Sequence, residues 1–251
     1  MRLIYFFLII ILFSGCANSQ NKVEEFFQTD NATHIKKDYY EIVNLLKKYK
    51  HKLDKRNPQN YDKKLSYYIY NEFDDYTNEL YLKENGKYIY KFSDYLKVAI
   101  SDKKVTNRND YLLLGIYKQV NDAYNIKEKI QISTFSYEID KLKNLYYTLN
   151  VINWQIKHKR DQNGSYLFLT WQNNWQIELE QKLQNTTLDN IVLSQLENIR
   201  LDKESLLSPS NNSFEILTSK MILHMAHSIK MLNEEPENLS IDAILSVILI
   251  I

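Results

Sequence analysis

The stretch "YLLLGIYKQVNDAY", residues 111–124, decides the fold class of this 251-residue chain. Its apolar residues return at three- and four-residue steps, which is the period of an α-helix and not of a β-strand. Asp110 stands directly before it, where a carboxylate can cap a helix. Gly115 lies inside the pattern, although a glycine there costs about 1 kcal/mol relative to alanine. We therefore expect a helix whose Gly115 is explained by the close approach of another helix.

The helical period returns on both sides of this stretch. Further helices are predicted at about 36–53, 58–85, 88–99, 136–156, 188–202 and 214–232. Asn57-Pro58 marks the start of the second of these helices and Asn85-Gly86 marks its end. The whole chain contains only four glycines and three prolines, which argues against the many turns of a β-sandwich or barrel. The sequence therefore predicts one mostly helical, all-α domain over residues 36–251.

Residues 151–171 can be interpreted in two ways. Asn163-Gly164 lies between two partly alternating runs, which is the strongest local signal for a β-hairpin. The helical stripe of the preceding segment nevertheless continues without a break into Ile156. We favour a helix, a loop and a second helix here, and keep a small β-hairpin within 151–171 as the alternative.

The first fifteen residues, "MRLIYFFLIIILFSG", have the layout of a secretory signal peptide. A basic residue, Arg2, precedes an apolar run, and the small residues Ser14 and Gly15 follow it. The apolar run is much shorter than the roughly 20 residues that a membrane-spanning helix needs. Cys16, the only cysteine of the chain, follows Gly15 directly. An ordinary secretory signal does not explain why the cysteine stands directly after the small residues.

The tetrapeptide "FSGC", residues 13–16, resembles the lipobox of bacterial lipoproteins. The resemblance implies cleavage between Gly15 and Cys16, a diacylglyceryl group on the Cys16 thiol and an acyl chain such as palmitate on the new amino group. Several acyl chains together hold a protein stably on a bilayer. In Gram-negative lipoproteins the residue after the cysteine directs sorting, and Ala17 implies the outer membrane with the body in the periplasm. Phe13 departs from the leucine that is commoner at its position. The alternative is an ordinary secretory signal with an incidental cysteine.

The body of the chain, from about residue 110 to 239, is similar to helical lipoproteins of Gram-negative bacteria with A/T-rich genomes. Two segments carry this similarity, "YLLLGIYKQVNDAY" and "YLFLTWQNNWQIELE". That group has no assigned activity, so the resemblance implies a location and a helical body but no reaction. The expected organisation is a signal peptide over 1–15, a lipidated cysteine and tether over 16–35, and the helical domain over 36–251.

Charge and motif content exclude several classes of function. The chain carries 32 basic and 31 acidic residues, and because Arg2 is the one charged residue of the signal peptide, cleavage leaves 31 of each. A nucleic-acid-binding protein normally shows a basic surplus, so no nucleic-acid partner is expected. The sequence contains no HExxH, no GxSxG and no glycine-rich phosphate loop. We therefore predict no catalytic residues and no cofactor other than the lipid on Cys16.

The stretch "TWQNNWQIELE", residues 170–180, is a candidate ligand site. On a helix, Trp171 and Trp175 would share one face and Gln172 and Gln176 would form a parallel pair of amides. Aromatic rings beside amides suit sugars, because the apolar face of a sugar stacks on a ring while the amides bind hydroxyl groups. The favoured alternative is that both indoles are half-buried core residues.

The stretch "MILHMAHSIKM", residues 221–231, is a candidate metal site. Met221, His224, Met225 and His227 lie within two helical turns of one another. Thioethers together with imidazoles are ligands for Cu(I). The favoured alternative is a buried amphipathic helix in which the methionines fill the core.

The leading hypothesis is a membrane-anchored periplasmic lipoprotein that acts as a non-enzymatic accessory, assembly or binding factor in the cell envelope. Its expected partners are the bilayer, through Cys16, and another envelope protein. The first alternative is a lipoprotein that binds or cleaves peptidoglycan or another glycan with the Trp171 and Trp175 face. The second is a copper carrier that uses Met221, His224, Met225 and His227.

Overall fold

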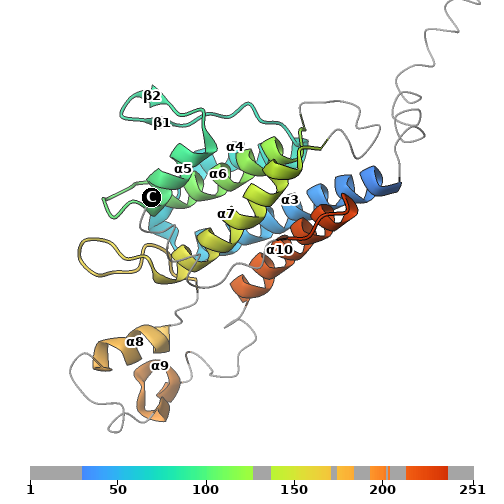
Figure 1. The fold of residues 1–251 in the computed structure, drawn as a ribbon. Helices are drawn as coiled ribbons and strands as arrows, with labels where there is room; N and C mark the ends of the chain where they lie inside the picture. Colours follow the sequence, from blue (N-terminus) through green and yellow to red (C-terminus); the bar gives the residue numbers. More distant parts are fainter. Residues whose placement is uncertain are drawn as a thin grey trace, which may run out of the picture.

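A computed structural model describes residues 30–126, 137–170, 174–183, 193–201, 203 and 213–236 of the chain (Figure 1). The elements of these residues are almost all α-helices, with one small two-stranded antiparallel sheet. The prediction of a mostly helical protein is therefore confirmed. No helix within the described ranges is both long enough and apolar enough to cross a membrane.

The elements are named in chain order. The helices are α3 (Asp30–Arg56), α4 (Lys63–Asp75), α5 (Phe92–Ile100), α6 (Arg108–Ala123), α7 (Ile139–His158), α8 (Asn174–Leu183), α9 (Glu197–Arg200) and α10 (Ser213–Met231). The strands are β1 (Lys83–Glu84) and β2 (Lys87–Tyr88). Short 3₁₀ turns occupy Pro58–Asn60 and Leu193–Gln195.

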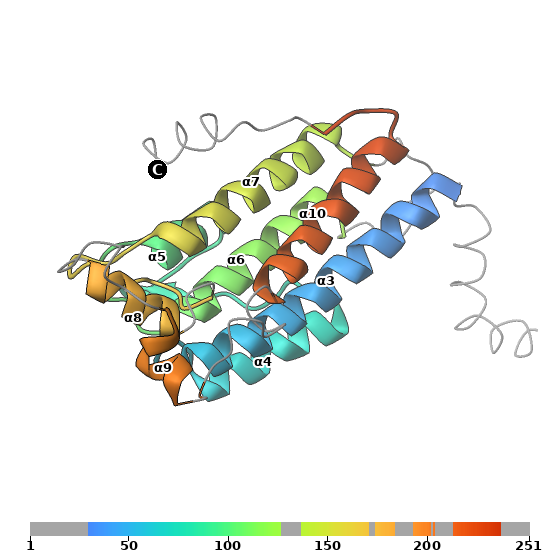
Figure 2. The same ribbon diagram turned by 90° about the horizontal axis from the view of Figure 1, so that it is seen from below.

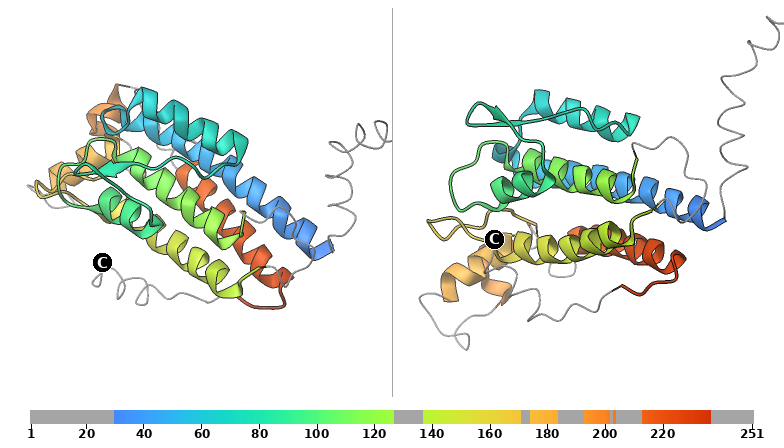
Figure 3. Two further views of the ribbon diagram at one scale, coloured as in Figure 1. Left: turned by 90° about the horizontal axis from the view of Figure 1, so that it is seen from above. Right: turned by 45° about the horizontal axis from the view of Figure 1, so that its top comes forward.

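The long helices form a bundle of three layers (Figures 2 and 3). In the right-hand view of Figure 3, α4 lies in one layer, α3 and α6 lie in the next, and α7 and α10 lie in the third. The short helix α5 packs against α6. The pair α8 and α9 lies at one end of the bundle (Figure 2). Because α6 is covered from several sides, almost every residue of it is buried.

Gly115 of α6 lies where α5 crosses at close range. A Cβ atom on Gly115 would stand 2.9 Å from the Tyr95 Cβ and 3.0 Å from the Leu96 Cδ2. The Tyr95 Cβ is fixed to the backbone of α5, so it cannot move aside without moving that helix. The close approach that the mid-helix glycine predicts is therefore confirmed.

We expect Gly115→Ala to lower the free energy of unfolding by up to about 2 kcal/mol. Alanine favours the helix by about 1 kcal/mol, but overpacking a close helix contact costs about 1–3 kcal/mol. The measurement is urea unfolding followed by circular dichroism. Asn44→Ala on the exposed face of α3 is the matched control, because it gains helix propensity without a clash and should be neutral or slightly stabilising. A Gly115→Ala variant as stable as this control would contradict the clash.

The first described helix begins earlier than the sequence predicts. Helix α3 starts at Asp30 rather than at residue 36, so the expected tether over 16–35 is too long at its C-terminal end. Ala32 and Ile35 are fully buried and continue the stripe that Tyr39 and Ile42 form further along. These residues are part of the helical domain because their side chains belong to its core.

The second predicted helix is shorter than expected at both ends. Asn57-Pro58 begins only a 3₁₀ turn, and α4 starts after Asp62, whose carboxylate accepts a hydrogen bond from the Leu65 N–H at 2.7 Å. The helix ends at Asp75, and Tyr76 adopts a left-handed conformation with φ of 53°. The Glu72 carboxylate then accepts hydrogen bonds from the chain that follows, at Thr77, Glu79 and Leu80. This buried carboxylate replaces the helical hydrogen bonds beyond Asp75.

The Asn85-Gly86 pair is the turn of a hairpin and does not end a helix. Strands β1 and β2 pair Lys83 with Tyr88 and Glu84 with Lys87. Asn85 and Gly86 have φ angles of 50° and 80°, and two positive φ angles are what a two-residue hairpin turn of type I′ requires. The helix predicted at 88–99 accordingly begins only at Phe92.

The ambiguous segment 151–171 resolves into a helix and a turn. Helix α7 continues to His158, and an isolated β-bridge then joins Arg160 to Tyr166 around Asn163-Gly164. The favoured order of helix, loop and second helix is found, but residues 166–170 are not helical and α8 begins only at Asn174. The isolated bridge is a reduced form of the hairpin alternative. The Asp161 carboxylate stabilises the turn, because its Oδ1 accepts hydrogen bonds from the N–H groups of Asn163 and Ser165, each at 2.9 Å.

The helix predicted at 188–202 is not continuous in its described part. Residues 193–201 form a 3₁₀ turn followed by the single turn of α9, and residues 188–192 lie outside the described ranges. A carboxylate from α8, that of Glu178, accepts a hydrogen bond from the backbone N–H of Glu197 at 2.6 Å. This contact from another helix fixes a new helix start inside the predicted one.

Candidate functional site

A cavity of about 840 Å³ lies beside the C-terminal half of α6. Its walls come from the end of α4, from the segment that leads into α5, from α6 and from the start of α7. We call it the tyrosine groove and define it by Tyr76, Asn78, Tyr81, Tyr90, Lys118 and Asn121. Its volume lies within the range of roughly 300–1,000 Å³ that is typical of small-molecule sites.

Lys118 organises one wall of the tyrosine groove. Its side chain is buried, its Nζ donates a hydrogen bond to the Asn78 Oδ1 at 2.9 Å, and the same Nζ lies 3.9 Å from the centre of the Tyr81 ring. Cation–π contacts of this kind are strongest where the cation is shielded from water. Lys118 therefore holds both an amide and an aromatic ring in place before any ligand arrives.

Asn121 is the buried polar group of the groove wall. Its side chain is 4% exposed, and its Oδ1 accepts a hydrogen bond from the Tyr39 hydroxyl at 2.8 Å. Burial raises the pKa of the neighbouring Tyr117 to about 12, and Asn121 together with Tyr39 opposes part of that rise. The Asn121 amide interacts with the Tyr117 hydroxyl, because a hydrogen bond from an amide N–H favours the charged form of Tyr117. The Nδ2 atom is enclosed by the protein, so Asn121 helps to build the groove wall.

The rim of the groove carries charges of both signs. The Lys141 Nζ forms ion pairs with Glu138 at 2.9 Å and with Asp122 at 3.4 Å. These partners raise the pKa of Lys141, the hydrogen bond from Lys141 to Glu138 having the largest effect. The ammonium group of Lys141 is therefore engaged by carboxylates of the chain itself.

The two histidines of the candidate metal site meet at one carboxylate of α3. Asp38 accepts hydrogen bonds from the His224 Nδ1 at 2.8 Å, from the His227 Nδ1 at 2.6 Å and from the Ser228 Oγ at 3.0 Å. The carboxylate is buried, whereas both imidazole rings are partly exposed. Hydrogen bonding to Asp38 fixes the protonated nitrogen of each ring at Nδ1. The cluster therefore joins α3 to α10.

The two methionines of the candidate metal site belong to the core. Met221 and Met225 are buried among apolar side chains, and the Met225 sulfur lies 3.9 Å from the Tyr124 hydroxyl. Of the four predicted ligands, the two methionines therefore lie in the core and the two histidines bind the carboxylate of Asp38. Across the ranges that the structure describes, no three His, Cys, Asp or Glu side chains stand together in a way that could hold a metal ion.

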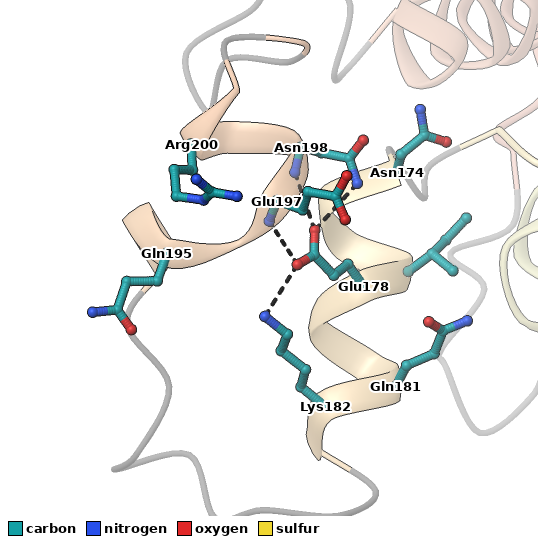
Figure 4. Close-up of a pocket in the computed structure, with 9 residues that line it drawn as sticks. Asn174, Glu178, Gln181, Lys182, Gln195, Glu197, Asn198 and Arg200 are labelled. Atoms are coloured by element: carbon teal, nitrogen blue, oxygen red, sulfur yellow. Dashed lines mark hydrogen bonds and ion pairs between the residues drawn. The ribbon is translucent and has the colours of Figure 1, made fainter.

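The tryptophan face is only partly described. Trp171 and Gln172 lie outside the described residues, while Trp175 and Gln176 lie on α8 and are half-buried. A polar cavity of about 550 Å³ lies between α8 and α9 (Figure 4). The pairing of two indoles on one face therefore stays a prediction.

Glu178 is the centre of the cavity between α8 and α9. In Figure 4 its carboxylate faces the first turn of α9, where it accepts hydrogen bonds from the backbone N–H groups of Glu197 and Asn198 and forms an ion pair with Lys182 at 3.1 Å. Burial alone would raise the pKa of Glu178, but these hydrogen bonds outweigh burial and lower the pKa to about 2. The charged carboxylate thus holds the two short helices together, which is a structural task.

Sequence reasoning missed the tyrosine groove and the Asp38 contact. The chain contains 20 tyrosines, and several of them are core residues, so tyrosine content does not mark the groove. The groove combines four separate segments, so no local pattern could reveal it. The position of Asp38 next to the apolar stripe of α3 was the feature of the sequence that could have indicated a buried carboxylate.

Comparison with known proteins adds no assignment, because no protein-family model, no curated protein and no solved structure matches the chain.

Proposed function

We propose that this chain is a lipid-anchored lipoprotein of the bacterial cell envelope, held by Cys16 at the periplasmic face of the outer membrane. The observation that carries the proposal is the position of the only cysteine, directly behind the apolar run and the small pair Ser14-Gly15. Lipid on this cysteine would leave the helical body tethered through the residues before Asp30. An outer-membrane location follows from Ala17 by its resemblance to lipoprotein sorting signals.

We propose further that the helical body is a non-enzymatic accessory or binding factor. The buried carboxylates of the described residues support this proposal, because they accept hydrogen bonds or form ion pairs within the chain itself. Asp38 binds two histidines, Glu72 binds backbone N–H groups, and Asp110 pairs with a lysine. The tyrosine groove, in contrast, combines rings and amides in a cavity of ligand size, which suits binding.

The test of the anchor is Cys16→Ala, expressed as the full chain in a Gram-negative host. We expect the unchanged protein to sediment with membranes and to need detergent for release, whereas Cys16→Ala is recovered in the soluble periplasmic fraction. Each buried CH₂ contributes about 0.8 kcal/mol, so losing all acyl chains removes the anchor completely. Mass spectrometry of the N-terminal peptide should find the lipid on Cys16.

Ser14→Ala is the matched control for this experiment. It keeps a small residue before the cleavage position and should leave both processing and sedimentation unchanged. An unmodified Cys16 in the mature protein would refute the anchor.

The test of the binding role is purification of the tethered protein in mild detergent, with Cys16→Ala as the untethered control. We expect an envelope protein to copurify with the tethered form and to be lost from the control. Turnover of an envelope substrate by the pure body would contradict a non-enzymatic role.

A further inference from the structure

A lysine-rich surface lies on the side of the bundle that carries the β-hairpin. A shallow hollow of about 650 Å³ separates the hairpin from α5. Four lysines and two tyrosines line it, and we call them the lysine face: Lys87, Lys91, Lys97, Lys103, Tyr88 and Tyr90. Glu84 and Asp94 are the acidic residues of the same hollow. Four basic and two acidic side chains give this small surface a net charge of +2, although the whole chain carries only +1.

The lysines of this face are open to water. All four are exposed, and within the described ranges none of them forms an ion pair with a carboxylate. Lys83 in β1 is a further exposed lysine beside them, and its Nζ lies 4.5 Å from the centre of the Tyr88 ring. Lys143 on α7, by contrast, pairs with Glu234 at 2.9 Å. The ammonium groups of the lysine face are therefore available to anions outside the chain.

Two tyrosines project among these lysines. Tyr88 is 53% exposed and Tyr90 is 68% exposed, and their ring centres lie 6.4 Å apart. Tyrosine is enriched where a bilayer meets water, because its ring lies at the level of the headgroups while its hydroxyl stays hydrated. Lysine suits the same zone, since its methylene chain covers apolar surface while its ammonium group stays in water. Together these side chains match a bilayer whose headgroups are anionic.

Other partners fit the lysine face less well. A soluble polyanion without aromatic rings would use the lysines and gain little from the exposed tyrosines. A nucleic acid would use both, but a nucleic-acid-binding protein normally has a basic surplus, and this chain carries 32 basic and 31 acidic residues. An apolar protein surface would have to desolvate the ammonium groups without pairing them.

The lysine face can reach the bilayer from an anchored Cys16. Residues 17–29 separate Cys16 from the start of α3 at Asp30, and they can span up to about 45 Å when fully extended. Helix α3, with 27 residues, is about 40 Å long. A tether as long as the bundle permits many orientations of the body and selects none of them. It does keep the body at a high effective concentration near the headgroups, so a modest attraction is sufficient.

We propose that the lysine face docks on the surface of a bilayer that contains anionic phospholipids, with its four lysines at the phosphates and Tyr88 and Tyr90 at the level of the headgroups. The proposal rests on the proposed function, because the anchor is what places the body beside a bilayer. In this orientation the β-hairpin faces the bilayer, and α10, which lies in the third layer of the bundle, faces away from it (Figures 1 and 3).

The experiment measures binding of the full chain with Cys16→Ala to vesicles, so that lipid on the cysteine does not contribute. The vesicles contain equal parts of phosphatidylglycerol and phosphatidylcholine, or phosphatidylcholine alone, and the titration is run at low ionic strength because the untethered face binds weakly. We expect binding to the anionic vesicles only, and its loss in about 1 M salt, where the Debye length is about 3 Å. Lys87→Gln combined with Lys91→Gln should bind about 30-fold more weakly, because each lysine near an anionic surface contributes a factor of about five.

Lys48→Gln combined with Lys220→Gln is the matched control. Both lysines are exposed, and they lie on α3 and α10 outside the lysine face. The control makes the same change of net charge and should bind the anionic vesicles as the unchanged lysines do. Equal losses in the two double variants would show that only the total charge of the protein matters, which would overturn the proposal.

A polarity-sensitive dye reports which surface touches the bilayer. Cys16 is the only cysteine, so in the Cys16→Ala chain either Tyr90→Cys or Leu223→Cys adds a single site for the dye. The two positions are 68% and 67% exposed, and Leu223 lies on α10. We expect the dye emission to shift to the blue on anionic vesicles at Tyr90→Cys and to stay unchanged at Leu223→Cys.

Three results would overturn the docking proposal: equal binding to both kinds of vesicle, binding to neither, or a blue shift at Leu223→Cys as large as that at Tyr90→Cys. Binding to soluble polyphosphate without binding to anionic vesicles would assign the face to a soluble polyanion and would overturn it as well. None of these results affects the lipid analysis of Cys16, which tests the proposed anchor separately.

Discussion

Replacing Lys50 by alanine is expected to lower the free energy of unfolding by about 3–5 kcal/mol, the cost of removing one partner from a buried ion pair. Lys50 is 0% exposed, and its Nζ lies 2.8 Å from the Asp54 carboxylate and 2.6 Å from the Asp110 carboxylate. The rings of Tyr61 and Tyr70 lie within 6 Å of the same ammonium group. Without Lys50, two carboxylates remain in the interior with no cation to balance them.

The pH dependence of this deficit follows from Asp110. Burial raises the pKa of the Asp110 carboxyl, and Lys50 opposes that shift. A carboxyl whose pKa is higher in the folded state than in the unfolded state adds stability as the pH falls through its folded pKa. Because loss of Lys50 raises this pKa further, we expect the deficit of Lys50→Ala to be smaller at pH 4 than at pH 7.

Urea unfolding at both pH values measures the effect of Lys50→Ala. Lys48→Ala is the matched control, since Lys48 lies on the same helix and is exposed. Adding Asp110→Asn to Lys50→Ala should recover part of the lost stability by removing one of the two carboxylate charges. Equal stability of the Lys50→Ala and Lys48→Ala variants would show that the pair contributes nothing.

Replacing Asp38 by alanine is the second large effect, with an expected loss of about 3 kcal/mol. Hydrogen bonds to a charged group contribute about 1.5–3 kcal/mol each, and Asp38 accepts three of them from α10. The two imidazoles are partly exposed and can form hydrogen bonds with water instead, so the loss of stability is smaller than the sum of the three hydrogen bonds. The buried Ser228 hydroxyl keeps Tyr124 as a partner, at 2.9 Å.

Hydrogen exchange measures where the Asp38→Ala variant loosens, and urea unfolding measures by how much. We expect faster amide exchange along α10 than along α6, because the three hydrogen bonds that Asp38 accepts all come from α10. Asp38→Asn keeps one acceptor oxygen, so its free energy of unfolding should lie between those of the unchanged protein and Asp38→Ala. Asp75→Ala removes an exposed carboxylate and should leave stability within about 0.5 kcal/mol. Uniform exchange across the bundle in Asp38→Ala would contradict the local role.

The helical fold could be predicted from the sequence because apolar periodicity is a local property. The same is true of Gly115, since a glycine inside a strong helical pattern points to a close contact. The ends of α4 could not be predicted, because the chain leaves the helix in order to wrap around the Glu72 carboxylate. Asn85-Gly86 was misjudged because the same dipeptide ends helices and turns hairpins.

The candidate site was beyond prediction for a different reason. Asp38 is separated from His224 by 186 positions, and nothing in the sequence near either residue indicates the other. The tyrosine groove depends on where α4, α5 and α6 come to lie, and the sequence periodicity fixes only which face of each helix is buried. Contacts between distant segments follow from packing, which a pattern of single residues does not contain.

The pairing of α3 with α10 has a consequence for how the protein reaches its native state. The first and the last described helices pack against each other, and they are also joined by the hydrogen bond from Asn31 to the Met231 carbonyl at 3.0 Å. Contacts between such distant parts of a chain form late and slow the folding reaction. A chain that is synthesised from its N-terminus would therefore keep the part of α3 that α10 covers exposed until the last helix arrives. During that interval the nascent chain is prone to aggregation.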